Sequence, residues 1–334
     1  MDTLLDFAQT FAIQLQKPTL AFLLGGMAVA AFGSKLSIPD SVYRFIVFML
    51  LMRIGLEGGM EIREADFRAI LLPAIFAVVI GCAIVLIGRF SLASLSAVNK
   101  TDGIATAGLF GAVSASTLAA GLVVLEENEI FFEAWVPALY PFMDIPALVV
   151  AIVLAHMSEQ KTNGKNTERP KAWPILVDSL RGSALSALIL GMILGLITRP
   201  EQVFEEFYDP TFKGLLSILM LIMGIEAWGR LSELAKVAHW FAIYALAAPI
   251  IHGLLGFGFG YLAHLATGFS PGGVILLAII AASNSDISGP PTLRAGIPKA
   301  NPSAYIGSST AIGTPVAIAV CIPLFITLAD IIFA

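Results

Sequence analysis

Hydrophobic positions along the chain form ten long runs separated by short polar stretches. Crossing the hydrocarbon core of a bilayer takes about 20 apolar residues in a helix. The predicted spans are 18–33, 42–60, 69–92, 103–125, 135–156, 183–198, 212–229, 237–265, 272–293 and 304–333. The first and sixth are short, whereas the eighth and tenth are long enough to tilt. The pattern predicts an all-α polytopic membrane protein with ten transmembrane helices.

Composition and charge support a membrane location and give an orientation. Of the 334 residues, 57% are hydrophobic and only 13% are charged, against about a quarter charged in soluble domains. With ten spans, thirteen Lys and Arg fall on one side and five on the other, and Arg53 lies inside a span. Because Lys and Arg accumulate in cytoplasmic loops, the richer side is predicted to be cytoplasmic. Both termini should then face outward, and the polar stretch 157–182 should be a cytoplasmic linker.

The two halves of the sequence match each other at a single offset of 169 residues. Gly55-Leu56-Glu57 falls on Gly224-Ile225-Glu226, and the polar run of the fourth span falls on that of the ninth. Five spans per half is an odd number, so the second half enters the membrane from the opposite side. Inverted repeats of this kind are typical of secondary transporters, whose sites lie near the midplane on interrupted helices.

The matched polar runs are the strongest candidates for a binding site. They contain Ser114, Ala115, Ser116 and Thr117 in the fourth span, and Ser283, Asn284, Ser285, Asp286 and Ser288 in the ninth. The following Gly289-Pro290-Pro291 predicts a helix break, since proline removes N–H groups and disfavours helix before it. Half-helix N-termini suit anions, and released carbonyls with a carboxylate suit cations. Close packing of small residues is the alternative interpretation of the two serines in the fourth span.

Carboxylates inside a span are costly and usually functional. Asp286 is the first candidate to bind a hard cation such as Na⁺, and Asp144 in the fifth span is the second. Thr310 and Thr314 lie in the matching tenth span, and nearby prolines could free carbonyl oxygens for the same ion or only bend the helices.

A third matched pair consists of Glu57 and Glu226, for which an interfacial cap and a gating role remain equally open. Arg53 can pair with Glu57 one helical turn on, or extend its charge to the interface. Arg294 follows the predicted break and could attract an anion at the cytoplasmic mouth.

Two other function classes, an intramembrane protease and a channel, share some of these sequence features. Two membrane aspartates and the Pro146-Ala147-Leu148 triplet suggest an intramembrane aspartyl protease, but Asp286 lacks the Gly-x-Gly-Asp context, and the triplet precedes it rather than following. A channel is a further alternative, although matched broken helices favour alternating access. The residues therefore favour a transporter over an enzyme.

Several long motifs resemble one family, the sodium-dependent bicarbonate transporters of cyanobacteria, SbtA. They include FMLLMRIGLEGGMEIR, GLFGAVSASTLAAGL, ALYPFMDIPALV, FYDPTFKGLLSILMLIMGIEAW and the stretch 281–318. The resemblance covers essentially the whole chain. It implies Na⁺/bicarbonate symport across the plasma membrane for a carbon-concentrating mechanism, with another Na⁺-coupled small anion as the alternative.

The same resemblance implies an assembly and a division into moving parts. It implies a homotrimer and control by a PII-like, adenylate-responsive partner, SbtB, on the cytoplasmic side. A gate domain would comprise 1–68 and 183–236, and a core domain 69–156 and 237–334, on either side of the linker. Bicarbonate would bind at Ser114–Thr117 and Ser283–Ser285, and Na⁺ beside it through Asp286, Ser288, and oxygens near Asp144 and Thr310.

Overall fold

The computed structural model describes residues 18–64, 67–163, 173, 177, 180–234 and 239–333, and this part of the chain is helical without strands. The helices are α2 (Pro18–Ala31), α3 (Asp40–Glu64), α4 (Phe67–Phe90), η1 (Leu92–Ser94), α5 (Lys100–Gly111), α6 (Ala115–Glu127), η2 (Val136–Leu139), α7 (Tyr140–Asn163), α9 (Ser183–Ile197), α10 (Glu201–Val203), η3 (Phe204–Tyr208), α11 (Asp209–Leu234), α12 (His239–Thr267), α13 (Pro271–Ala282), α14 (Gly289–Gly296), α15 (Pro302–Ser308), η4 (Ser309–Gly313), α16 (Thr314–Val316), η5 (Ala317–Cys321) and α17 (Ile322–Phe333). Most of the expected linker and the residues before Pro18 lie outside the described residues.

Six helical stretches of the described chain are long and apolar enough to cross a membrane. They are Ala69–Ser94, Lys100–Glu127, Val136–Ser158, Glu201–Gly229, His239–Thr267 and Pro302–Phe333. The expected first and sixth spans are short, as α2 and α9 have 14 and 15 residues. The polytopic all-α class is confirmed, and the number of ten spans stays a prediction.

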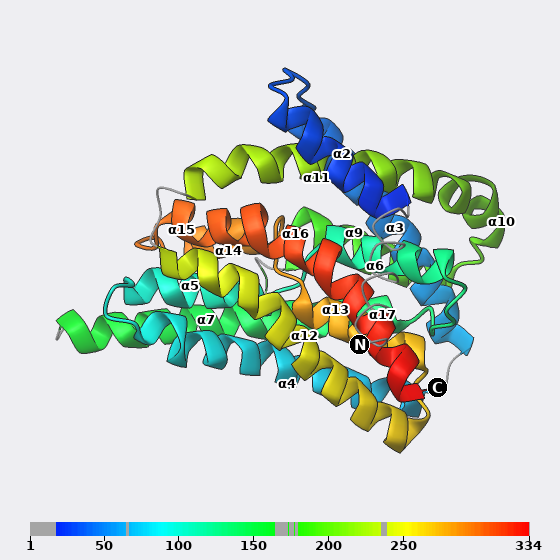
Figure 1. Cartoon of the computed structure of the whole chain (residues 1–334). Helices are drawn as coiled ribbons and strands as arrows, with labels where there is room; N and C mark the ends of the chain where they lie inside the picture. The colour runs from blue at the N-terminus through cyan, green and yellow to red at the C-terminus, as the bar shows by residue number, and fades with distance from the viewer. Residues whose placement is uncertain are drawn as a thin grey trace.

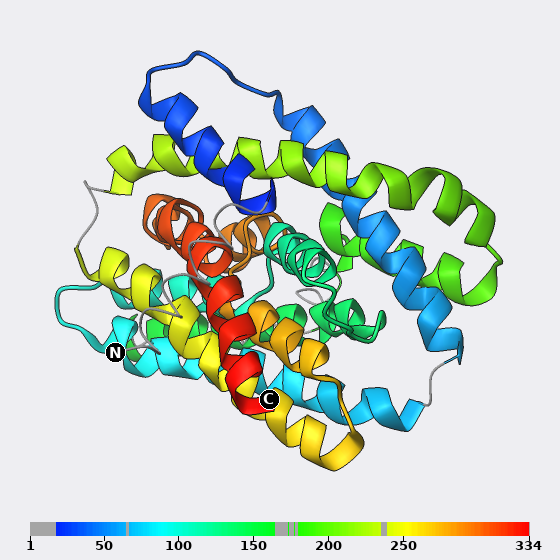
Figure 2. The ribbon, with the colours of Figure 1, turned by 45° about the vertical axis from the view of Figure 1, so that its right-hand side comes forward.

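The helices form two bodies of different shape. Helices α2, α3, α9 and α11 pack mainly on one another and make what we call the four-helix layer. Helices α4 to α7 and α12 to α17 make the larger core bundle. In Figure 1, α2 and α11 run across the top of this bundle, and Figure 2 shows α2, α11 and α3 along its upper and right-hand sides. Two polar segments interrupt helices of the core bundle: 112–114 between α5 and α6, and 283–288 between α13 and α14. We call them the first and the second junction. Both lie inside the core bundle, with the four-helix layer on one side.

Glycines allow the helices of the four-helix layer to approach closely. A Cβ atom added at Gly224 of α11 would lie 2.0 Å from the carbonyl oxygen of Leu23 in α2, and one at Gly55 of α3 would lie 2.4 Å from that of Leu188 in α9. Without a hydrophobic driving force between helices in lipid, such small residues supply the packing contacts. Gly55 and Gly224 also occupy matching positions at the offset of 169 residues.

Both predicted polar runs interrupt a helix. Helix α5 ends at Gly111 and α6 begins at Ala115, while α13 ends at Ala282 and α14 begins at Gly289. The Gly-Pro-Pro sequence of the ninth span was predicted to break the helix by disfavouring helix before it, and the break lies directly before Gly289. The two prolines themselves open α14, because the first helical turn needs no N–H partner there.

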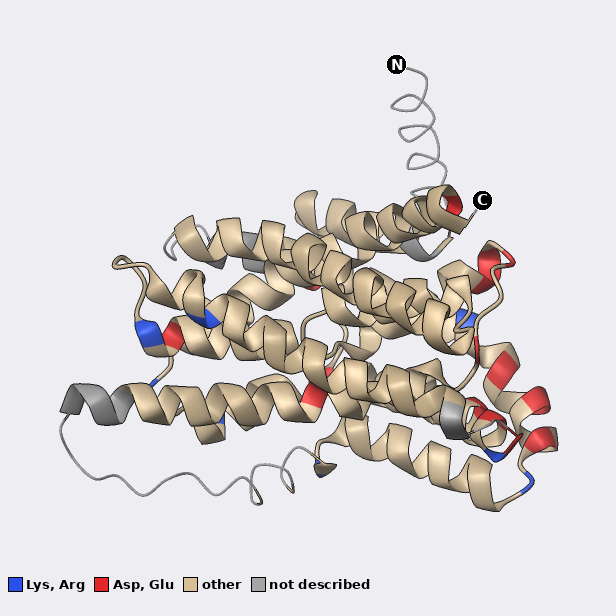
Figure 3. Cartoon of the chain, turned by 90° about the horizontal axis from the view of Figure 1, so that it is seen from below, with Lys and Arg blue, Asp and Glu red and all other residues tan. Residues whose placement is uncertain are grey.

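Acidic side chains gather at one end of the molecule. Asp and Glu are concentrated at one end of the molecule in Figure 3. Five glutamates at that end, Glu57, Glu61, Glu64, Glu201 and Glu205, line one cavity of about 310 Å³ together with Arg63. The larger cavity, described below, is lined by Arg44, Arg181 and Arg294. This segregation agrees with the loop charges on which the predicted orientation rests.

One carboxylate at the acidic end fixes the start of α13. Glu133 accepts the N–H and the hydroxyl of Ser270 at 2.8 and 2.7 Å, and the same hydroxyl accepts the N–H of Gly273 at 2.9 Å. We expect Glu133→Ala to lower the free energy of unfolding by about 1–2 kcal/mol, because the N-cap loses its orienting partner. Thermal unfolding of the purified protein measures this, with the exposed Glu205→Ala as control. Equal stability of both variants would contradict the assigned role.

Candidate functional site

The two helix junctions touch each other at positions that the repeat makes equivalent. The backbone N–H of Ser114 donates to Ser283 Oγ at 3.1 Å, and these residues are 169 positions apart. A second bond joins the N–H of Ser285 to the carbonyl oxygen of Leu109 at 2.9 Å. Backbone groups that the helix breaks release are therefore satisfied across the junction, as burial at membrane depth requires.

Asp286 lies at this contact with one oxygen bonded and one left without a partner. Its Oδ2 accepts the hydroxyl of Ser116 at 2.8 Å and that of Tyr43, from α3, at 3.4 Å. Its Oδ1 is buried and has no hydrogen-bond partner in the structure. An orphaned oxygen of a buried carboxylate, whose other oxygen accepts two hydroxyls, fits a hard cation, which prefers oxygen ligands.

Asp144 is fully buried and accepts a hydrogen bond from the backbone of the first junction. Its Oδ1 accepts the backbone N–H of Val113 at 2.9 Å, within the break between α5 and α6. Ser288 Oγ lies 3.5 Å from both carboxylate oxygens and 3.0 Å from Ser285 Oγ. A chain of hydroxyls thus leads from this carboxylate into the second junction, where Asp286 lies.

Asn284 connects the second junction to the last helix. Its Oδ1 accepts the hydroxyls of Ser309 at 2.7 Å and Thr314 at 2.8 Å, where the helix widens into the π-helical turn η4. The hydroxyl of Thr310 instead donates to the carbonyl oxygen of Ile306, and Thr310 lines the larger cavity described below. Of the two predicted threonines, Thr314 therefore contacts an amide and not a carboxylate.

The N-terminus of α6 presents polar groups to the same place. Ser114 caps the helix by accepting the N–H of Thr117 at 3.2 Å, and its Oγ lies 2.8 Å from Ser116 Oγ. Thr117 Oγ1 is buried without a hydrogen-bond partner. A helix of 13 residues carries a partial positive charge at this end. Ser114–Thr117 thus combine N–H groups and hydroxyls that suit an anion.

A cavity of about 650 Å³ leads from Asp286 toward the arginine-rich end. It is lined by Asp40, Tyr43, Arg44, Arg181, Gly182, Ser183, Met223, Glu226, Asp286, Ile287, Ser288, Pro290, Pro291, Thr292, Arg294, Ile306 and Thr310. The structure therefore brings Glu226 and Arg294 to the cavity of Asp286. Glu57 lines the smaller acidic cavity at the other end, where it forms an ion pair with Arg53 at 2.5 Å.

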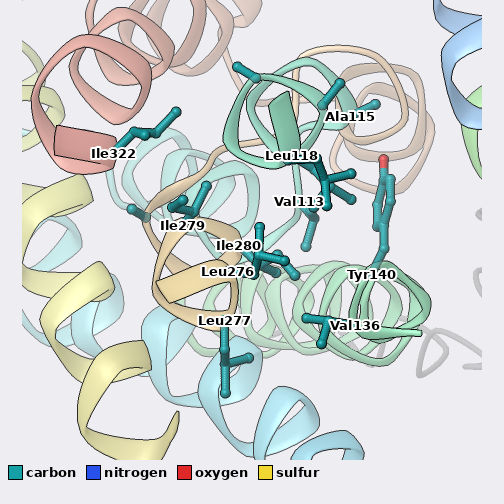
Figure 4. Packing of buried hydrophobic residues seen from close by; sticks show 14 of the residues in the cluster. Val113, Ala115, Leu118, Val136, Tyr140, Leu276, Leu277, Ile279, Ile280 and Ile322 are labelled. Carbon is teal, nitrogen blue, oxygen red and sulfur yellow. The ribbon is translucent and has the colours of Figure 1, made fainter. Parts of the chain in front are cut away.

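Apolar side chains surround the polar junctions on the remaining sides. Figure 4 shows Val113 of the first junction and Leu118 of α6 near Tyr140, with Ile279 and Ile280 of α13 on the neighbouring side. All five are at most 1% exposed. Polar groups inside such a low-dielectric shell interact more strongly with an ion than they would in water.

The sequence interpretation missed three side chains of the site. Tyr43 and Tyr140 bring hydroxyls to Asp286 and Ser288, and Ser309 bonds Asn284. Each tyrosine lies in an apolar run, where an aromatic residue is ordinarily packing, and only the fold places them at the junction. Ser309 adjoins Thr310 in a polar run of the tenth span, which is the signal that could have identified it.

The bond between the two junctions gives a direct test. We expect Ser283→Ala to lower the free energy of unfolding by about 1–3 kcal/mol, because the buried N–H of Ser114 loses its acceptor. Thermal unfolding of the purified variant measures this, beside the exposed Ser303→Ala. Equal stability of the two variants would mean that the contact is dispensable.

Comparison with known proteins completes this description. A search of curated proteins returned no match. The model of one protein family, described as the Na⁺-dependent bicarbonate transporter superfamily, matches residues 18–330 and thus nearly the whole chain. The match runs from the start of α2 into α17 and includes every residue of the site described above. The chain therefore belongs to the Na⁺-dependent bicarbonate transporter superfamily.

Proposed function

We propose that the protein is a secondary transporter that carries Na⁺ and bicarbonate together in the same direction. Membership of a transporter family means that the chain is not an enzyme, which removes the aspartyl protease alternative. The observation that supports symport best is the position of Asp286. Its unpaired Oδ1 is a cation ligand next to the N-terminus of α6, which suits an anion.

In the proposed site, the two ions depend on each other. Na⁺ binds at Asp286 Oδ1, and the hydroxyls of Ser116, which bonds the other carboxylate oxygen, and of Ser288 are the further ligands. Bicarbonate binds at the N-terminal turn of α6 with Ser283 and Ser285 opposite. A buried charge without a counterion is costly, so each ion lowers the cost of binding the other. This mutual stabilisation is the coupling that symport requires.

We further propose ten spans arranged as an inverted repeat. Shifted by 169 residues, α3 (40–64) falls on 209–233, and α11 is Asp209–Leu234. The bond between Ser114 and Ser283 joins equivalent positions of the two halves. In this proposal the core bundle moves against the four-helix layer, which corresponds to the gate domain, and the cavity at Asp286 is the cytoplasmic opening of one state.

The physiological setting is also a proposal, and it rests on the resemblance to the cyanobacterial transporters. The protein would lie in the plasma membrane of a cyanobacterium with both termini periplasmic, and would supply bicarbonate to a carbon-concentrating mechanism. It would work as a homotrimer in lipid and respond to the PII-like regulator SbtB on its cytoplasmic face. The arginine-rich end of the large cavity is the end assigned to that face.

Uptake of labelled bicarbonate into proteoliposomes tests the function. We expect accumulation with an inward Na⁺ gradient, and only background entry when K⁺ replaces Na⁺ on both sides. Nitrate or formate in excess distinguishes the alternative of another small anion, since competition by one of these stronger than competition by unlabelled bicarbonate would reassign the substrate. Equal entry with and without Na⁺ would contradict the proposal.

A further inference from the structure

A buried arginine of the four-helix layer bonds a carboxylate of the core bundle far from the ion site. Arg53 of α3 is only 4% exposed. Its guanidinium contacts Glu57 of its own helix and Asp209 of α11, at 2.5 and 2.7 Å, and these two partners belong to the four-helix layer. Its third partner, Glu126 at 3.4 Å, lies near the end of α6 in the core bundle. Only this third contact crosses between the two bodies.

The four-helix layer surrounds this contact on several sides. The ring of Phe212 lies with its centroid 4.4 Å from the Arg53 guanidinium carbon, and that of Phe204 lies at 5.4 Å. Lys213 of α11 approaches the other oxygen of Glu126 at 3.9 Å. Two cations from two helices of the layer therefore meet one carboxylate of the core bundle. Packing and two further ion pairs hold Arg53 in the four-helix layer. If the core bundle moves relative to this layer, Arg53 therefore stays with the layer.

The same half-helix connects this contact to the ion site. Helix α6 has Ser116 at its N-terminal end, bonded to Asp286, and Glu126 at its C-terminal end. Its 13 residues span about 20 Å as a rigid rod. Any movement that carries the site relative to α3 also moves Glu126 away from Arg53. The ion pair can therefore exist only in conformations close to the one observed, in which the cavity is open at the arginine-rich end.

We propose that Arg53 and Glu126, assisted by Lys213, form a latch that holds the core bundle in this conformation and must open in every transport cycle. The residues act on position and do not touch the transported ions. The proposal rests on the proposed transport function and adds a state-specific contact to it. A two-state equilibrium shifts only through interactions whose free energy differs between the two states. The ion pair of Arg53 with Glu126 is such an interaction, because it forms in one of the two states only.

Distances between two spin labels measure the populations of the two states. The labels are placed on exposed positions of the layer and of the core bundle, as Val42→Cys and Phe90→Cys, with Cys82 and Cys321 replaced. We expect Glu126→Gln to change the ratio of the two distance populations about two- to fivefold away from the observed conformation, as for a partly exposed ion pair. Glu129→Gln removes the same charge from the neighbouring exposed position and should leave the ratio unchanged. An unchanged ratio in Glu126→Gln would overturn the latch.

Cross-linking tests the requirement that the contact opens. In a double variant, Glu126→Cys and Lys213→Cys, a short bifunctional thiol reagent that a reductant releases should arrest bicarbonate uptake, and reduction should restore it. Before cross-linking, the double variant must show Na⁺-dependent uptake, which separates failure of the latch from failure of the proposed function. Continued uptake by the fully cross-linked protein would overturn the latch while leaving symport intact.

Discussion

Asp286→Ala is expected to abolish Na⁺-dependent bicarbonate uptake while the protein still folds. The substitution removes the carboxylate whose Oδ1 is buried and unpaired, and with it the charge that draws Na⁺ into the junction. Without the cation, bicarbonate meets a buried site that lacks a counterion, so its binding weakens as well. Labelled uptake in proteoliposomes measures the loss, and thermal unfolding with a single elution peak shows whether folding is preserved.

A matched control separates this ion site from the general charge of the cavity. Asp40 lines the same cavity from the start of α3 and is exposed. Asp40→Asn removes the same formal charge, but an exposed charge is screened by salt, so uptake should stay within about threefold of the original rate. Wild-type uptake by Asp286→Ala would contradict the assigned site, as would equal losses in both variants.

Gly224→Ala is expected to have the largest effect on folding. Its Cβ would lie 2.0 Å from the Leu23 carbonyl oxygen and 2.8 Å from the Met27 nitrogen, and both are backbone atoms that no side-chain rotation can move. Helices α2 and α11 must therefore separate, with a loss of packing that we expect to reach about 3 kcal/mol or more. Thermal unfolding in detergent and the yield of monodisperse protein measure the effect.

The same helix provides the comparison. Gly214 of α11 has no atom within 4 Å of an added Cβ. Gly214→Ala should therefore be neutral or stabilising, by up to about 1 kcal/mol, since alanine favours helix over glycine. If Gly224→Ala proved as stable as Gly214→Ala, the close contact between α2 and α11 would not exist in the folded protein.

Periodicity and polarity were sufficient to predict the helical class and both polar junctions. Burying serines, an asparagine and an aspartate within six residues of an apolar run costs free energy that close packing does not recover. Ser283–Ser288 was therefore predicted to be a binding site. The offset of 169 residues also placed Ser114 opposite Ser283, and the structure has a hydrogen bond between them. The polar run is a local feature and the offset is a repeat within the chain, and the sequence displays both directly.

Contacts between distant helices could not be predicted in the same way. Tyr43 reaches Asp286 across 243 positions of the chain, and nothing around a tyrosine at the start of an apolar run indicates this partner. Pairing with Glu57 was one of two predictions for Arg53, and this pair is present, but its bonds to Asp209 and Glu126 depend on how α11 and α6 pack on α3. The second break was predicted from the prolines, but the prediction did not include that the same prolines begin the next helix.

The most direct test of the central claim measures Na⁺ rather than bicarbonate. In proteoliposomes with equal Na⁺ on both sides, an inward bicarbonate gradient at fixed pH should drive radiolabelled Na⁺ inward above its equilibrium level, and Asp286→Ala should show no such accumulation. Coupling between two bound ions is reciprocal, so a symporter must show this effect. Bicarbonate entry without any associated accumulation of Na⁺ would contradict the account.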